Sequence, residues 1–206
     1  LADSSQLAPD LDAGSLDLVD TVGEPEPARL EQLARDAEAA AQSVDGVTQV
    51  QSASATYGRR AIHLATTNGF TGGYENTGHS VSCVAIAGTG AGMERDYDYD
   101  SRTHASDMRA AGDIGAEAGQ RAVARHGARK PATGTYPVLF DERIASSLIG
   151  HLLAAANGAA IARGSSWLLE SMNTQVLPET LSIIENPHRP RVQGSRLFDA
   201  EGLPTS

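Results

Sequence analysis

The sequence predicts an α+β fold: a helix, an antiparallel four-stranded meander and a second helix, followed by the start of a second α/β-type domain. Leucine and alanine first recur at helical spacing, and four alternating stretches with Gly-bearing turns follow. A basic linker with Pro and Gly, residues 127–134, then separates the two parts. We therefore expect an acidic connector (1–24), a middle domain (25–130) and an incomplete C-terminal domain (131–206).

The first helix follows the acidic connector. Residues 1–26 hold seven acidic side chains and no basic one, which is typical of a solvated segment. Pro25 and Pro27 then open a helix, because proline is tolerated in the first helical turn and the glutamates there complement the helix dipole. The apolar spacing continues to about Val44, and Gly46 ends the helix.

Four strands should follow in a meander, because short turn sequences separate the alternating stretches. The expected strands cover residues 47–57, 61–66, 79–87 and 93–102. The expected turns are 58–60, Asn68-Gly69 with the loose Gly72-Gly73, and 88–92. The last turn is rich in glycine, but it lacks the Gly-Lys-Ser/Thr ending of a phosphate loop and leads into a strand rather than a helix.

The fourth strand carries alternating aspartates and tyrosines. Asp96, Asp98 and Asp100 share one face, and Tyr97 and Tyr99 share the other. Three carboxylates in a row could attract a cation. The sequence lacks the Gly turn and distal Glu of a calcium loop, so we expect a solvated acidic face.

The remaining elements follow from capping and spacing signals. Ser106 or Asp107 could cap a second helix that runs to about His126. Beyond the linker, we expect a strand over 136–140, a helix over 141–157 capped by Asp141, and a strand over 181–185. The start at Leu1 and the end at Ser206 suggest a fragment of a longer protein.

Composition excludes several classes of partner. The net charge of −10 disfavours direct contact with nucleic acid, because phosphate backbones would be repelled. The apolar runs are far shorter than the ~20 residues that span a bilayer. The acidic start lacks the basic region of a signal peptide, and Cys83 alone cannot form an internal disulfide. We therefore expect a cytoplasmic protein, with Cys83 as a buried, inert thiol.

The candidate chemistry lies on the helix over 141–157. Its stretch from Ser146 to His151 has the outline of a metalloprotease helix, but a catalytic zinc normally takes three protein ligands. Serine hydroxyls are poor zinc ligands and weak bases. A Ser–His pair is conceivable, yet no G-x-S-x-G elbow and no orienting acid accompany it. We expect His151 to be a core histidine, Ser165-Ser166 to lack a partner, and His188 to lie in an exposed loop. We assign no catalytic, cofactor-binding or metal residue.

Several segments taken together resemble the TldD/PmbA family, specifically its PmbA branch, which is also called TldE. They are 136–140 (YPVLF), 145–151 (ASSLIGH), 164–168 (GSSWL), 181–187 (LSIIENP) and 198–202 (FDAEG), with 68–70 (NGF) and 95–97 (RDY) upstream. The resemblance covers most of residues 25–206, and its specificity comes from the set rather than from any one piece.

The resemblance implies a subunit of a cytoplasmic TldD/TldE metalloprotease that acts on extended, unfolded peptides; an older name for the family is modulator of DNA gyrase. The TldD subunit carries His-Glu-x-x-x-His and a later Cys. On this sequence the motif falls on Ser146, Ser147 and His151, and only the last matches. The later Cys would lie beyond residue 206. The resemblance therefore implies a chain without its own metal site, with zinc expected only on a TldD-like partner.

Three functions follow from these expectations. The first is a PmbA/TldE-like subunit that supports a TldD-like partner as a heterodimer. The second is a self-sufficient metallopeptidase, possibly a homodimer, that is completed by residues outside this sequence. The third is a regulatory binding protein, whose acidity would suit a basic partner.

Overall fold

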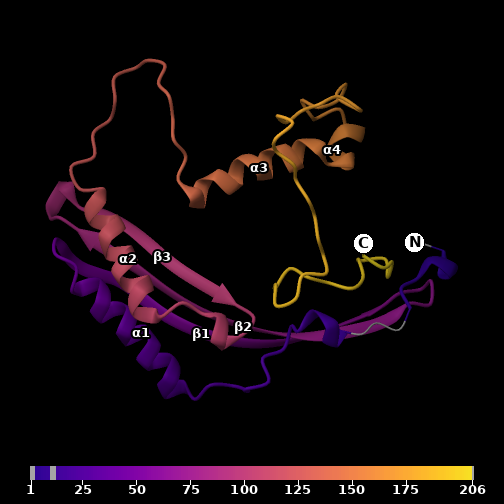
Figure 1. Ribbon diagram of the computed structural model, residues 1–206, viewed down its shortest axis with the longest axis horizontal. Coiled ribbons are helices and arrows are strands. Elements are labelled where there is room, and N and C mark those ends of the chain that lie inside the picture. The colour runs from indigo at the N-terminus through magenta and orange to yellow at the C-terminus, as the bar shows by residue number, and fades with distance from the viewer. Residues whose placement is uncertain (1–2, 10–12, 206) are drawn as a thin grey trace. The chain divides into compact units, whose positions relative to one another are not determined.

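The computed structural model describes residues 3–9 and 13–205 and confirms the α+β class. The chain forms two compact units, each described separately below. The first contains Leu1–Arg129 and Asn186–Ser206, and the second contains Lys130–Glu185. Figure 1 shows the three strands and the helices α1 and α2 of the first unit, and α3 and α4 of the second. In the part of the chain that the structure describes, no helix is long and apolar enough to cross a membrane.

The first unit is built on one antiparallel sheet, whose three strands lie in the order β1-β2-β3. Its strands are β1 (Val47–Ala65), β2 (Thr71–Ala87) and β3 (Glu94–Arg102). The prediction of four strands is wrong because residues 58–60 continue β1 and pair with residues 76–78 of β2. The Arg59 guanidinium also forms an ion pair with Glu75 across the two strands, a contact that favours an extended strand over a turn.

The turn predicted at Asn68-Gly69 is confirmed. Gly69 has a φ of +97°, which glycine adopts at little cost. Gly72 and Gly73 are paired with β1 instead of forming a loose connection. The result is one long hairpin, whose two strands reach well beyond the end of β3 (Figure 1).

Two helices, α1 (Pro27–Gln42) and α2 (Ala111–Ala124), pack on one face of the sheet. The second helix begins later than predicted, because Ala105–Asp107 forms a 3-10 turn and Met108 and Ala110 are extended. The shared core consists mainly of small side chains from the two helices and β2, with Ile114 as its largest fully buried member. Helices lined by alanine and glycine can approach each other and the sheet closely, so small side chains are sufficient to fill the core.

Cys83 lies in this core and is fully buried, as predicted. Burial raises the pKa of its thiol to about 11, because the thiolate would lose its hydration. We expect the folded protein to resist a thiol-specific disulfide reagent at pH 8 and to react with one equivalent after unfolding. An exposed control, Ser52→Cys, should react at once in the folded state. Rapid labelling of Cys83 in the folded protein would contradict this expectation.

Residues 186–205 return to the first unit and cover the far part of the hairpin. The Phe198 ring packs against Phe70 and Tyr74, with ring centroids 4.8 and 5.6 Å apart. Gly202 has a φ of +84°, and a Cβ built on it would lie 2.4 Å from Cγ of Phe70. Only glycine therefore fits this close approach.

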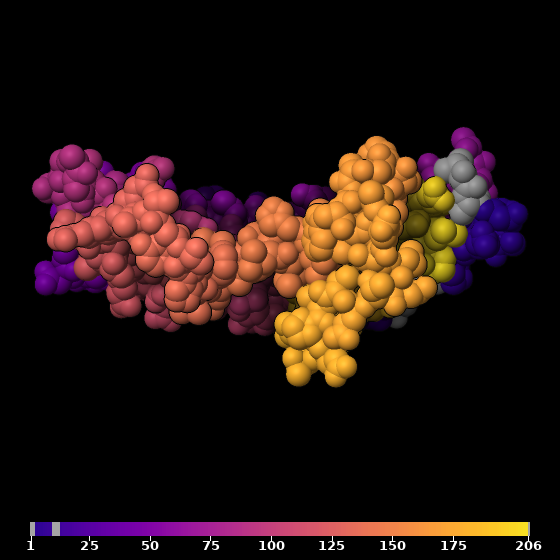
Figure 2. Space-filling view, turned by 90° about the horizontal axis from the view of Figure 1, so that it is seen from above, coloured from indigo at the N-terminus to yellow at the C-terminus, as the bar shows by residue number. Residues whose placement is uncertain are grey.

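The second unit contains α3 (Glu142–Ala156) and the short α4 (Gly158–Ala162). Asp141 caps α3 as predicted, since its carboxylate accepts from the backbone N–H of Arg143. The strands predicted over 136–140 and 181–185 are wrong: the described residues of this unit form no strand, because no neighbouring strand pairs with these segments. Many apolar side chains of the unit are exposed, and Leu139 is 98% exposed. One face of the unit is visible in coral to orange in Figure 2.

Candidate functional site

The structure places the predicted candidates of α3 at the surface. Ser146, Ser147 and His151 are all exposed. The Ser147 hydroxyl donates to the carbonyl of Ile144 at 2.6 Å, within its own helix. The expectation that His151 is a core histidine is wrong, because nothing in the second unit packs over this part of α3.

These side chains do not form a metal centre in the described parts of the chain. No group of three or more His, Cys, Asp or Glu residues among them is placed to hold a metal ion. A serine nucleophile would require a hydrogen bond to an imidazole, but the Ser147 hydroxyl donates to a carbonyl of its own helix. Ser166 is buried and donates to the carbonyl of Ala155. His188 is exposed, as predicted.

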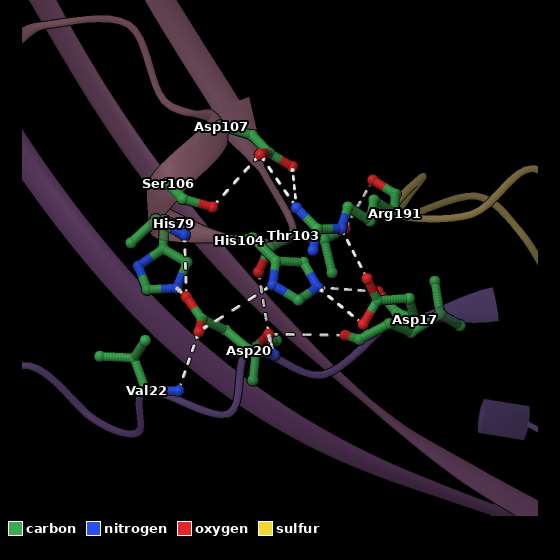
Figure 3. Close-up of polar contacts among 12 residues, drawn as sticks. Asp17, Asp20, Val22, His79, Thr103, His104, Ser106, Asp107 and Arg191 are labelled. Carbon is green, nitrogen blue, oxygen red and sulfur yellow. Dashed lines mark hydrogen bonds and ion pairs between the residues drawn. The ribbon is translucent and has the colours of Figure 1, made fainter. Parts of the chain in front are cut away.

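A buried polar cluster in the first unit centres on Asp20 (Figure 3). Its carboxylate accepts hydrogen bonds from the backbone N–H groups of Ala105 at 2.8 Å and Val22 at 3.0 Å. These two donors, the Ala105 bond above all, hold the pKa of Asp20 below its usual value. Nε2 of the buried His79 lies 3.1 Å from Oδ2 of Asp20, without the angles of a hydrogen bond.

The outer part of the cluster is an ion-pair network around Arg191. Its guanidinium donates to the carboxylates of Asp17 at 2.6 Å and Asp107 at 3.1 Å. The hydrogen bond from Arg191 lowers the pKa of Asp17. His104 lies between the two parts, with Nε2 2.9 Å from the carbonyl of Asp17. The backbone carbonyl of Arg191 also accepts from the Thr103 hydroxyl at 3.0 Å.

The cluster therefore joins segments that are distant in the sequence, and sequence reasoning missed it. Residues 1–24 were expected to be an acidic connector, and within them Leu16, Leu18 and Asp20 are buried. Hydrophobic alternation does not mark this segment in the sequence, because the apolar Val19 is less buried than the acidic Asp20 and because Asp17 has a φ of +47°.

The aspartate row of β3 contradicts the expected solvated face. Asp96, Asp98 and Asp100 are buried, whereas Tyr97 and Tyr99 are exposed on the opposite face and stack at 6.2 Å. The carboxylates face cations from α2 and from the residues just before and just after it. The ion pairs join Asp98 to Arg109 and Arg121, and Asp96 to Arg125. These cations and hydrogen bonds make burial of the aspartates tolerable, so the row is a packing interface.

Comparison with known proteins gives matches along nearly the whole chain. Residues 20–125 match the family model of the PmbA/TldA metallopeptidase central domain, and residues 133–206 match that of the C-terminal domain. The chain is 35% identical over 207 aligned positions to "Metalloprotease PmbA" of Escherichia coli O157:H7, with 100% of this chain and 45% of the relative covered. A "Metalloprotease PmbA homolog" of Haemophilus influenzae is 34% identical over 132 residues, with 64% of this chain and 29% of the relative covered.

Solved structures agree in fold. A Bacteroides thetaiotaomicron protein named as a modulator of DNA gyrase aligns with a TM-score of 0.88 at 28% identity, with 100% of this chain and 47% of that chain covered. TldE of Thermococcus kodakarensis aligns with a TM-score of 0.68 at 18% identity, with 89% of this chain and 41% of that chain covered, a likeness of fold alone. The chain spans less than half the length of these relatives.

Proposed function

The chain belongs to the PmbA/TldD metallopeptidase family, and from this premise we propose that it is a PmbA/TldE-type subunit without its own metal site. In this role it supports proteolysis of extended peptides in the cytoplasm by a TldD-like partner that carries the zinc. The alternative is a self-sufficient peptidase that acts as a homodimer, and the metal analysis below must distinguish it from the non-catalytic subunit.

The chemistry of α3 is the observation that carries the proposal. In the family motif, positions 146, 147 and 151 supply a ligand, a base and a ligand, but here the first two are serines. A catalytic zinc site needs about three protein ligands and a base near its water. One histidine and two hydroxyls, both of which donate to carbonyls of their own helix, provide neither.

A non-catalytic subunit can still contribute to proteolysis. Extended peptides bind proteins by adding a strand to an open sheet edge, where backbone hydrogen bonds supply affinity without demanding a sequence. The exposed apolar side chains of the second unit, such as Leu139, Trp167 and Ile184, are also suited to contact with further protein.

Metal analysis of the full-length protein tests the proposal. We expect substoichiometric zinc and no cleavage of an unstructured peptide by this protein alone, with cleavage restored by a TldD-like partner. The double variant Ser146→His and Ser147→Glu rebuilds the motif around His151 and should increase zinc binding.

A matched control changes two exposed positions of the same helix outside the motif, Ile149→His and Gly150→Glu, and should leave zinc binding low. Stoichiometric zinc in the unmodified protein that is lost in His151→Ala would refute the proposal. Chelator-sensitive cleavage by the protein alone would instead support the self-sufficient peptidase.

A further inference from the structure

A cavity of about 370 Å³ lies on the hairpin of β1 and β2, on the face of the sheet that does not pack against the helices. Odd-numbered side chains of β2, such as Val81 and Cys83, point into the helix-covered core, and even-numbered ones point to the other face. Gly58 and Gly78 lie directly opposite each other on this second face. A glycine pair across two strands leaves a hollow, where a ligand can approach the backbone closely.

The side chain of Gln193, from the returning segment 186–205, covers only one half of this hollow. A Cβ built on Gly78 would lie 2.8 Å from Nε2 of Gln193. A Cβ built on Gly58 would have no atom of the described residues within 4 Å, apart from its own chain neighbours. The space over Gly58 is therefore open to a ligand, and the Gln193 amide lies at its side.

Arg60 and Asn76 are the polar residues of the two strands beside this space. They lie directly opposite each other, two residues along from the glycine pair, so their side chains share its face. Within the described ranges 3–9 and 13–205, Arg60 forms no ion pair and the Asn76 side chain forms no hydrogen bond. The neighbouring Arg59 differs, because it projects to the opposite face and pairs there with Glu75. Arg60 and Asn76 are thus both available to a ligand.

The charges around the cavity favour a ligand with one negative charge. The lining includes two arginines and no acidic side chain, although the net charge of the chain is −10. A planar guanidinium binds a carboxylate through two parallel hydrogen bonds. The negative charge of the remaining chain repels a doubly charged phosphate more strongly than a carboxylate. Side-chain amides both donate and accept, which suits a peptide group next to the carboxylate.

We propose that this cavity binds the C-terminal carboxylate of an extended peptide. The Arg60 guanidinium holds the carboxylate over Gly58, and the amides of Asn76 and Gln193 form hydrogen bonds with the last peptide group. The site uses no residue of α3, so the proposal does not depend on the function proposed above.

Fluorescence polarisation of an alanine tetrapeptide, labelled at its N-terminus and titrated with the full-length protein, tests the assignment. We expect the peptide with a free C-terminus to bind saturably. The same peptide with a C-terminal amide should bind at least about tenfold more weakly, because it cannot form the charge-assisted pair with the guanidinium. Acetate and inorganic phosphate, the other sources of an oxyanion, should each displace the peptide only at concentrations at least about tenfold above those of unlabelled peptide.

Two pairs of matched variants locate the binding. Gly58→Val fills the hollow with a side chain that suits a strand and should abolish binding, whereas Ser54→Val adds the same side chain to the same face four residues earlier and should leave binding unchanged. Arg60→Gln should weaken binding at least about tenfold. Arg59→Gln removes the same charge from the opposite face and should change binding by less than about twofold, because solvent and salt screen that charge.

Circular dichroism establishes that each variant is folded. Equal binding of the free and amidated peptides would overturn the proposal, as would displacement by phosphate or acetate at the concentration of unlabelled peptide that displaces it. Unchanged binding to folded Gly58→Val, or equal effects of Arg60→Gln and Arg59→Gln, would place the peptide elsewhere on the protein and would also overturn it.

Discussion

Gly115→Ala is expected to destabilise the first unit by about 3 kcal/mol or more. A Cβ built on Gly115 of α2 would lie 1.9 Å from the carbonyl oxygen of Ala37 on α1. The obstacle is backbone rather than a flexible side chain, so the helices must move apart and the core they share must open. Chemical denaturation followed by circular dichroism measures the change.

Gly112→Ala is the matched control. Gly112 lies one turn earlier on the same helix, and a Cβ there would meet only Cβ of Ala40, at 3.9 Å. Alanine is favoured over glycine inside helices, so this variant should be neutral or up to about 1 kcal/mol more stable. If the two variants had the same free energy of unfolding, the close helix contact at Gly115 would be disproved.

Asp98→Ala is expected to cost about 2–3 kcal/mol of stability. The Asp98 carboxylate is buried and accepts from Arg109 and Arg121, each at 2.7 Å. Removal of Asp98 leaves the largely buried Arg121 without this partner at the sheet. The Arg109 side chain is 41% exposed and can turn to solvent, so the cost falls below that of breaking a fully buried pair.

The control for Asp98 is an exposed ion pair. Glu31 and Arg35 lie one turn apart on α1, and both side chains are more than 60% exposed. Glu31→Ala should change the free energy of unfolding by no more than about 0.5 kcal/mol. A loss in Asp98→Ala as small as that in the control would show that the buried ion pairs of Asp98 stabilise the fold no more than an exposed pair does.

The sequence was sufficient for α1, α3 and the turn at Asn68-Gly69, where local spacing and φ preferences decide the structure. It placed the start of α2 too early and did not predict α4. It was insufficient for β1, because the glycine and arginines at 58–60 are typical of a turn, and only pairing with β2 keeps them extended. Strand propensity depends on the partner strand, which a local pattern does not contain.

The two faces of β3 illustrate a second limit. Alternation correctly separated the aspartates from the tyrosines, but period 2 does not tell which face is buried. Hydropathy favours burial of the tyrosines. Arginines in and next to α2 reverse this preference, because they form ion pairs with Asp96 and Asp98.

The candidate sites differ in the same way. The sequence alone shows that His151 lacks the other residues of the metal-binding motif, because this depends only on residue type. The sequence does not predict that His151 is exposed, because exposure depends on which segments pack over α3. The contact between Asp20 and His79 joins residues 59 positions apart, and no spacing rule predicts a contact of that kind.

The return of the final segment to the hairpin has a consequence for synthesis on the ribosome. The Asn68 side chain donates to the carbonyl of Glu201, 133 residues later, and Thr103 bonds to Arg191. The first unit is thus complete only after all of Lys130–Glu185 has been translated. Until then the Phe70 ring lacks its contact with Phe198, and the Asp17 carboxylate lacks its ion pair with Arg191. The incomplete hairpin is therefore exposed to wrong strand pairing during synthesis.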